Sequence, residues 1–99
     1  MLTYKTILNK IEQNPENIKK YGFKKIGLFG SYIKNKQTYD SDIDILVEFK
    51  KGKKNFDNYM DLKFFLEDLL KSKVDLVISE VIKPELRSYI LDEVSYAGI

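Results

Sequence analysis

The sequence predicts a small α/β (α+β) protein in which a mixed β-sheet is flanked by helices. Three apolar runs, 26–29, 42–49 and 74–78, have the length and composition of buried strands. The segments around them repeat apolar residues every three or four positions, as amphipathic helices do. A chain of 99 residues fits one domain, 1–99, with room for one core and one site.

Two helices are predicted before the first strand. Residues 3–13 place four apolar side chains on one helical face: Tyr4, Ile7, Leu8 and Ile11. Asn14 as N-cap and Pro15 at the first helical position then start a short second helix over 15–21. The apolar run 26–29 follows as a buried strand.

The middle of the chain is predicted to form a helical turn, a strand and a long helix. The turn covers 31–36, and the strand 42–49 alternates, so that Asp42 and Asp44 point to the same side. The other side of this strand is apolar: Ile43, Ile45, Val47 and Phe49. After a lysine-rich connection, 50–55, the long helix buries one stripe: Leu62, Phe65, Leu66, Leu69 and Leu70.

A third strand and a last helix complete the predicted order. The strand 74–78 carries Asp75 among apolar residues. Pro84 starts the last helix, whose predicted inner face is Leu86, Tyr89, Ile90 and Val94. Because an unpaired buried carboxylate is costly, we interpret Asp75 as a functional residue.

The composition limits which residues can act in catalysis and which kinds of partner are expected. The chain is 43% hydrophobic and 32% charged, and no apolar run approaches a membrane span, so no membrane partner is expected. The start lacks a signal-peptide pattern and Cys is absent, from which we expect a cytoplasmic protein. Without His or Cys, any general base must be Asp, Glu, Lys or Tyr. The net charge of +2 does not predict direct nucleic-acid binding.

One lysine cluster has two interpretations. Lys50, Lys51, Lys53 and Lys54 surround Gly52. They form either a solvated loop or a surface that contacts phosphates or an acidic partner.

A Gly-Ser turn and three Asp residues together predict a site for a nucleotide and metal ions. Gly30 lets the backbone approach an anion closely, Ser31 adds a hydroxyl, and Lys34 lies one turn further on. Carboxylates at Asp42 and Asp44 lie about 6.5 to 7 Å apart at Cα on a strand, close enough to share divalent ions. Each part alone is also typical of an ordinary turn, a solvated pair or a cap. The combination predicts phosphoryl-type chemistry.

These motifs resemble the polymerase β-type nucleotidyltransferase superfamily, in its minimal, stand-alone (MNT) branch. The resemblance spans 23–78 and rests on Gly30-Ser31, on the run from Ser41 through Phe49, and on Asp75. It implies the nucleotidyltransferase fold, a Gly-Ser turn that holds the triphosphate of ATP, and two Mg²⁺ ions. By this resemblance Asp42, Asp44 and Asp75 are the metal-binding and catalytic residues, and Asp75 helps to activate the attacking hydroxyl. The family often has Ala-Arg-Gly where this chain has Ile33-Lys34-Asn35, so bidentate phosphate contact is lost while a positive charge remains.

The resemblance also implies a biological role. Similar stand-alone proteins are antitoxins encoded beside a HEPN-domain ribonuclease toxin, and they transfer AMP from ATP to a toxin tyrosine. A hetero-oligomer with the toxin is therefore expected, because the chain is too short for an acceptor-binding domain of its own. Two alternatives remain: a non-catalytic antitoxin that caps its toxin stoichiometrically, and nucleotidyl transfer to RNA or a small molecule.

The aromatic content has two interpretations as well. Seven Tyr and six Phe exceed what one small core needs, which fits a contact surface. Alternatively several of them, including Tyr32, Tyr39 and Tyr59, are simply exposed.

Overall fold

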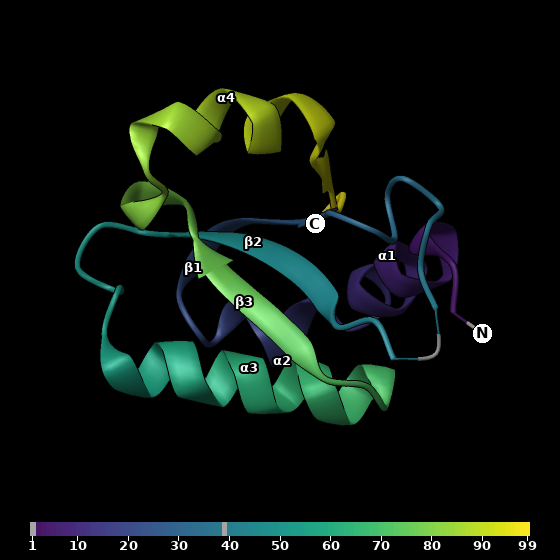
Figure 1. The fold of residues 1–99 in the computed structure, drawn as a ribbon. Coiled ribbons are helices and arrows are strands. Elements are labelled where there is room, and N and C mark those ends of the chain that lie inside the picture. Colours follow the sequence, from purple (N-terminus) through teal and green to yellow (C-terminus); the bar gives the residue numbers. More distant parts are fainter. Residues whose placement is uncertain (1, 39) are drawn as a thin grey trace.

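The computed structural model describes residues 2–38 and 40–99, and it contains a four-stranded sheet with helices on both faces (Figure 1). The elements in chain order are α1 (Tyr4–Glu12), α2 (Pro15–Lys19), β1 (Phe23–Phe29), β2 (Ile43–Phe49), α3 (Phe56–Leu70), β3 (Val74–Ile78), the 3-10 turn η1 (Ser79–Val81), α4 (Pro84–Glu93) and β4 (Ser95–Tyr96). The predicted fold class, a mixed sheet flanked by helices, is confirmed.

The order of strands in the sheet is β3-β2-β1-β4. β1 is antiparallel to β2 and to β4, whereas β2 is parallel to β3, with α3 as the crossover between the two parallel strands. The register places Asp44 opposite Phe29 on one side and opposite Asp75 on the other. The central strand therefore brings one predicted site residue next to the end of β1 and to β3.

The main core lies between the sheet and the layer formed by α1, α2 and α3. Ile7 and Ile11 of α1 are fully buried, as are Ile18 of α2 and Leu62 and Leu66 of α3. They pack against the residues of the strands that point to this side, including Ile26, Leu28, Ile43, Ile45, Val47, Val74 and Leu76. The predicted apolar stripes of the first and third helices are thus confirmed.

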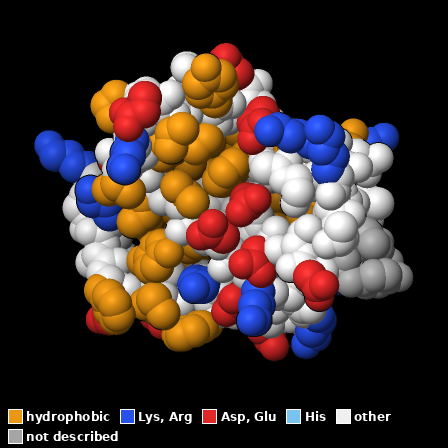
Figure 2. All heavy atoms as spheres, viewed as in Figure 1, with side chains coloured by type: hydrophobic (Ala, Val, Ile, Leu, Met, Phe, Trp, Pro, Cys, Tyr) orange, Lys and Arg blue, Asp and Glu red, His pale blue; other side chains and the backbone are white. Residues whose placement is uncertain are grey.

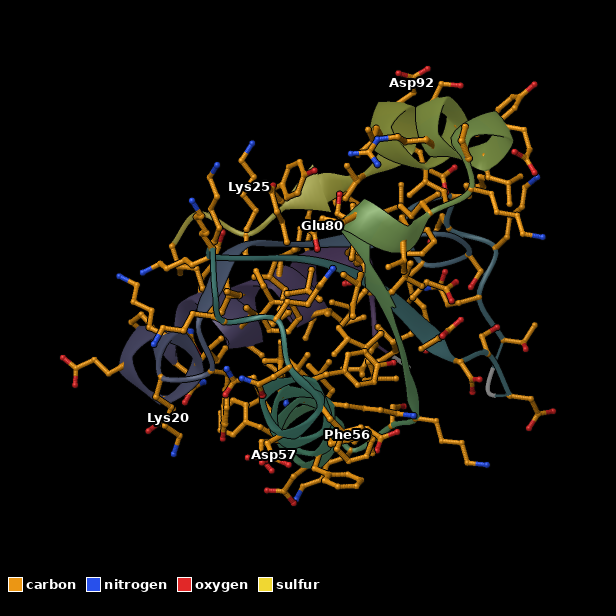
Figure 3. All side chains as sticks on the ribbon, turned by 90° about the vertical axis from the view of Figure 1, so that its left-hand side faces the viewer. Lys20, Lys25, Phe56, Asp57, Glu80 and Asp92 are labelled. Atoms are coloured by element: carbon orange, nitrogen blue, oxygen red, sulfur yellow. The ribbon has the colours of Figure 1, made fainter. Side chains whose placement is uncertain are left out.

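The other face of the sheet is covered by α4, which lies above the strands in Figures 1 and 3, and by the segment that leads to it from η1. Its small core contains Phe29, Leu46 and Ile82, with Ile90 and Val94 packed against them. The prediction that Leu86 and Tyr89 lie on the inner face was wrong, because they are 50% and 73% exposed. A single helix of ten residues leaves much of this face open, and none of its residues is fully buried.

Several boundaries differ from the prediction. β1 begins at Phe23 rather than Ile26, and α2 ends at Lys19 rather than Tyr21. The Asn14 side chain does not cap α2, because its amide donates to the Lys10 carbonyl at 2.8 Å. The predicted helical turn at 31–36 is a hydrogen-bonded turn without a regular helix.

One strand was not predicted. β4 consists of two residues that pair with Gly27 and Leu28 of β1. Gly27 permits this approach, because a Cβ there would lie 2.8 Å from Val94 Cγ2 and 2.9 Å from the Ser95 carbonyl oxygen.

Two aromatic residues have structural roles that the sequence did not reveal. Tyr32 is buried in the main core, and Tyr59 is half-buried, so the interpretation that both are simply exposed was wrong. Tyr39 lies outside the described residues. The large exposed aromatic residues are others, including Phe56, Phe64 and Tyr89. Among the helices of the described residues, none is both long and apolar enough to cross a membrane.

Candidate active site

The three predicted carboxylates lie in the segments where β2 and β3 begin. Asp44 and Asp75 are each the second residue of their strand and are Cα partners in the parallel pair, where neighbouring strands lie about 4.8 Å apart. Asp42 directly precedes β2. Since Ile43, Ile45 and their neighbours face the main core, the alternation turns Asp44 and Asp75 toward the α4 side.

Two hydrogen bonds position β3, and with it Asp75, against α3. The Tyr59 hydroxyl donates to the Leu76 carbonyl at 2.7 Å, and the Val74 N–H donates to Glu67 Oε2 at 3.0 Å. Both flank Asp75 in the chain. The strand register next to Asp44 is therefore held by side chains of the helix on the opposite face.

Asp75 is exposed, which corrects the expectation of a buried carboxylate. The sequence places it among apolar residues, but the open part of the α4 side leaves this residue of β3 in solvent. Asp42 is also exposed, and Asp44 is half-buried. Figure 2 shows acidic side chains gathered near the middle of the molecule, beside an apolar area below α4. An external hydroxyl can reach such an edge without opening the fold.

The surroundings of Asp44 shift the pKa of its carboxyl. Burial, and after it the neighbouring charges of Asp75, Asp42 and Glu93, together raise the pKa of its carboxyl from 3.8 to about 6. The proximity of the Asp75 side chain adds to this upward shift of the pKa. Close carboxylates that repel one another are a typical arrangement for a cation site or for acid–base chemistry.

The Gly-Ser turn lies directly beside Asp44. Gly30 has φ +76, and a Cβ at this position would overlap the Asp44 carboxylate. Glycine is therefore required both by the backbone conformation and by the close approach of the acid. The predicted helix after Gly30 is absent, but free N–H groups are still present there. Within the described residues, the N–H groups of Ser31, Tyr32 and Ile33 have no hydrogen-bond acceptor. These N–H groups are free to donate hydrogen bonds to a phosphate.

Glu93 is a site residue that the sequence interpretation missed. Its Oε1 accepts the Gly30 N–H at 3.0 Å, and its Oε2 lies 3.2 Å from Lys34 Nζ. Gly30 and Lys34, predicted to contact phosphate, are thus both engaged by one carboxylate. A signal was available in the sequence: Asp92 and Glu93 place negative charge at the carboxyl end of a helix, where the macrodipole disfavours it.

The described carboxylates are not grouped as a ready-made metal centre. Among residues 2–38 and 40–99, no three His, Cys, Asp or Glu side chains are arranged to hold a metal ion. The donors nevertheless fit a hard cation, since Asp44 and its partner Asp75 supply only oxygen and repel each other in its absence. A cation would relieve that repulsion.

A small hollow borders Asp42. Asp42 lines a hollow of about 270 Å³ with Asp40, Ser41, Ser72 and Lys73. A hollow of about 560 Å³ lies elsewhere, between α3 and the residues that follow α2. The hollow beside Asp42 is thus the smaller of these two.

A mixed sheet that presents a Gly-Ser turn beside strand-borne carboxylates is a nucleotidyltransferase-type arrangement, and sequence comparison agrees. Residues 8–97 match the nucleotidyltransferase domain model. Protein adenylyltransferase MntA of Thermococcus cleftensis is 34% identical over 97 residues, which are 97% of each chain. MJ0435 of Methanocaldococcus jannaschii, by its name a candidate protein adenylyltransferase, is 46% identical over 74 residues, 75% of this chain and 78% of that protein. The chain belongs to the nucleotidyltransferase domain family.

Solved structures place the chain in the minimal branch of this family. A candidate minimal nucleotidyltransferase has a TM-score of 0.81 with 30% identity, and the match covers 95% of both chains. A chain from the structure of the tri-AMPylated Shewanella oneidensis HEPN toxin in complex with MNT antitoxin has a TM-score of 0.65 with 27% identity. That match covers 96% of this chain and 71% of the other. The predicted enzyme class and the resemblance to MNT proteins are confirmed.

Proposed function

We propose that this protein is an antitoxin that transfers AMP from ATP to a tyrosine hydroxyl of a cognate HEPN ribonuclease toxin. The observation that carries the proposal is the pairing of Asp44 with Asp75 beside the Gly30 turn. Support for the acceptor comes from the similarity to a protein adenylyltransferase and to a chain solved in complex with an AMPylated HEPN toxin.

The proposed reaction is a displacement at the α-phosphorus of ATP. The tyrosine oxygen forms a bond to the α-phosphorus, the bond to the bridging oxygen breaks, and pyrophosphate leaves with that electron pair. Asp75 accepts the hydroxyl proton, a role that its exposure at the edge of the site permits. Asp42, Asp44 and Asp75 would hold Mg²⁺, which neutralises the charge of the phosphates when it is bound.

The turn is proposed to bind the rest of the triphosphate. The N–H groups that follow Gly30 offer donors to phosphate oxygens, and the Ser31 hydroxyl adds one more. Lys34 supplies a positive charge from a side chain that is 55% exposed and so able to reorient. Together these groups would orient the α-phosphorus toward the carboxylates.

The small size of the hollow beside Asp42 supports an acceptor that brings its own binding surface. A hollow of about 270 Å³ encloses little of an acceptor, so a small acceptor would be held weakly. A different surface, the apolar area around α4, favours one alternative, stoichiometric capping without turnover. Its exposed apolar side chains are Val81, Leu86 and Tyr89. Transfer to RNA or a small molecule would use the same carboxylates with another acceptor.

Turnover separates the enzyme from the capping protein. The protein is mixed at one-twentieth of the concentration of the neighbouring gene product, with ATP and Mg²⁺, and the partner is weighed by intact mass spectrometry. The proposal expects nearly all partner molecules to gain AMP and to stay inactive after the antitoxin is removed. Asp75→Asn serves as the matched variant and should leave the mass of the partner unchanged. Capping would be established instead if the partner stayed unmodified and was inhibited only at equal stoichiometry, and if Asp75→Asn inhibited it equally well.

A further inference from the structure

The carboxylate of Glu93 engages two groups of the turn that we propose as the phosphate site. Glu93 is the last residue of α4, far in sequence from the turn, and one oxygen of its carboxylate accepts the Gly30 N–H at 3.0 Å. The other oxygen lies 3.2 Å from Lys34 Nζ. A carboxylate that bridges a backbone N–H and an ammonium group makes the contacts that a phosphate makes at such turns.

These contacts of Glu93 have two consequences for the binding of a polyanion such as a triphosphate. First, Lys34 is not free to bind it until the ion pair with Glu93 opens. Second, Glu93 adds a negative charge to a site that already contains Asp44 and Asp75, and like charges oppose the entry of phosphate. Both effects weaken binding relative to a turn that lacks Glu93.

We propose that Glu93 is an internal competitor for the phosphates of the nucleotide, and that it sets their affinity by engaging Lys34. The inference rests on the proposed function, because it takes the Gly30 turn as the phosphate site. Nucleotide binding then requires Glu93 to leave Lys34, and the return of Glu93 promotes the release of pyrophosphate. The residue is thus an affinity-determining residue and takes no part in the chemical step.

The surroundings of Glu93 allow it to leave without disrupting the fold. Its side chain is 22% exposed, and Lys34 is more exposed still. α4 contains no buried residue, and the strand that follows it has only two residues. A rotation of the side chain is sufficient to open the ion pair, and exposed ion pairs are worth little in stability.

The test compares Glu93→Gln with Asp92→Asn. Gln keeps an oxygen that can accept the Gly30 N–H but has no charge for Lys34. Asp92→Asn makes the same change of charge one residue earlier, where the side chain is exposed and points away from the sheet (Figure 3). Calorimetric titration with inorganic tripolyphosphate measures phosphate affinity without the base, the acceptor or the transfer reaction.

The expected result is a Kd for tripolyphosphate about fivefold lower for Glu93→Gln, the equivalent of an exposed ion pair of about 1 kcal/mol. Asp92→Asn should remain within about twofold of the natural protein, because its charge is further from the turn. In a Lys34→Met background, Glu93→Gln should bring no gain, since the contact that it frees has been removed.

Three results would overturn the inference: weaker or unchanged binding by Glu93→Gln, an equal gain from Asp92→Asn, or a gain that persists with Lys34→Met. Weaker binding would make Glu93 a residue that positions the turn for phosphate. The proposed function is tested separately, because AMP transfer by the natural protein stands whether or not Glu93→Gln tightens binding. Conversely, tighter phosphate binding with no AMP on the partner would support the inference and reject the acceptor.

Discussion

Removal of the Asp44 charge should stabilise the metal-free protein, but only at pH values at which the carboxyl would be ionised. The pKa of Asp44 is raised to about 6 in the folded protein, against 3.8 as its ordinary value. The folded state therefore holds this proton more tightly than the unfolded chain does. The resulting stability is fully present below about pH 4 and is lost as the pH rises through about 6. Asp44→Asn is neutral at every pH and should not show this loss.

The size of the effect follows from the shift. A change from 3.8 to about 6 corresponds at most to roughly 3 kcal/mol. Because Asp44 is only half-buried, solvent screening reduces this figure, and we expect about 1 kcal/mol. In a domain of this size, that difference changes Tm by about 4 to 8 °C.

Differential scanning calorimetry in chelator at pH 4 and pH 7.5 measures this difference. Asp44→Asn should melt about 4 to 8 °C above the natural protein at pH 7.5 and close to it at pH 4. Asp61→Asn, which removes an exposed carboxylate from α3, should show no comparable dependence on pH. A lower Tm for Asp44→Asn at both pH values would mean that the Asp44–Asp75 contact is structural, and the account of the site would be wrong.

The turn and the anchors of β3 provide further tests. ATP with Mg²⁺ at a hundredfold excess over Kd should stabilise the protein by about 2.7 kcal/mol, and calorimetry should show a smaller shift in chelator and with Ser31→Ala or Lys34→Ala. Identical melting curves in all cases would favour the non-catalytic module. Gly30→Ala should lower the free energy of unfolding in urea by about 1 to 2 kcal/mol, because φ of Gly30 is +76. An unchanged urea midpoint would contradict this expectation. Tyr59→Phe should cost about 1 kcal/mol by removing the bond to Leu76, and a loss below about 0.3 kcal/mol would mean that this bond does not hold β3.

The strands that carry the carboxylates were predictable because their signals are local. The run Val74–Ile78 is bounded by polar residues and has the boundaries of β3. The alternation of apolar residues after Asp42 likewise predicted β2 and the side to which Asp44 points. Helices α1 and α3 followed from apolar residues at helical spacing, which reflects the packing of one face.

The remaining features depend on contacts between distant parts of the chain. Two exposed lysines follow Phe23, so the apolar run that predicted the first strand began only at Ile26. β4 has two residues and exists only through its pairing with β1. The exposure of Asp75 depends on how little of the sheet α4 covers, which no local pattern reports. Glu93 reaches the Gly30 turn from the other end of the chain.

The most direct test of the account follows each phosphate of ATP in the presence of the neighbouring gene product. ATP labelled at the α-phosphate and ATP labelled at the γ-phosphate are supplied in parallel with Mg²⁺, and the label on the partner and the free pyrophosphate are counted. The account predicts α-label on a tyrosine of the partner, one pyrophosphate for each AMP added, and neither product with Asp44→Asn or Asp75→Asn. Transfer of the γ-label, or α-label that persists in both variants, would contradict the assignment of these carboxylates to adenylyl transfer.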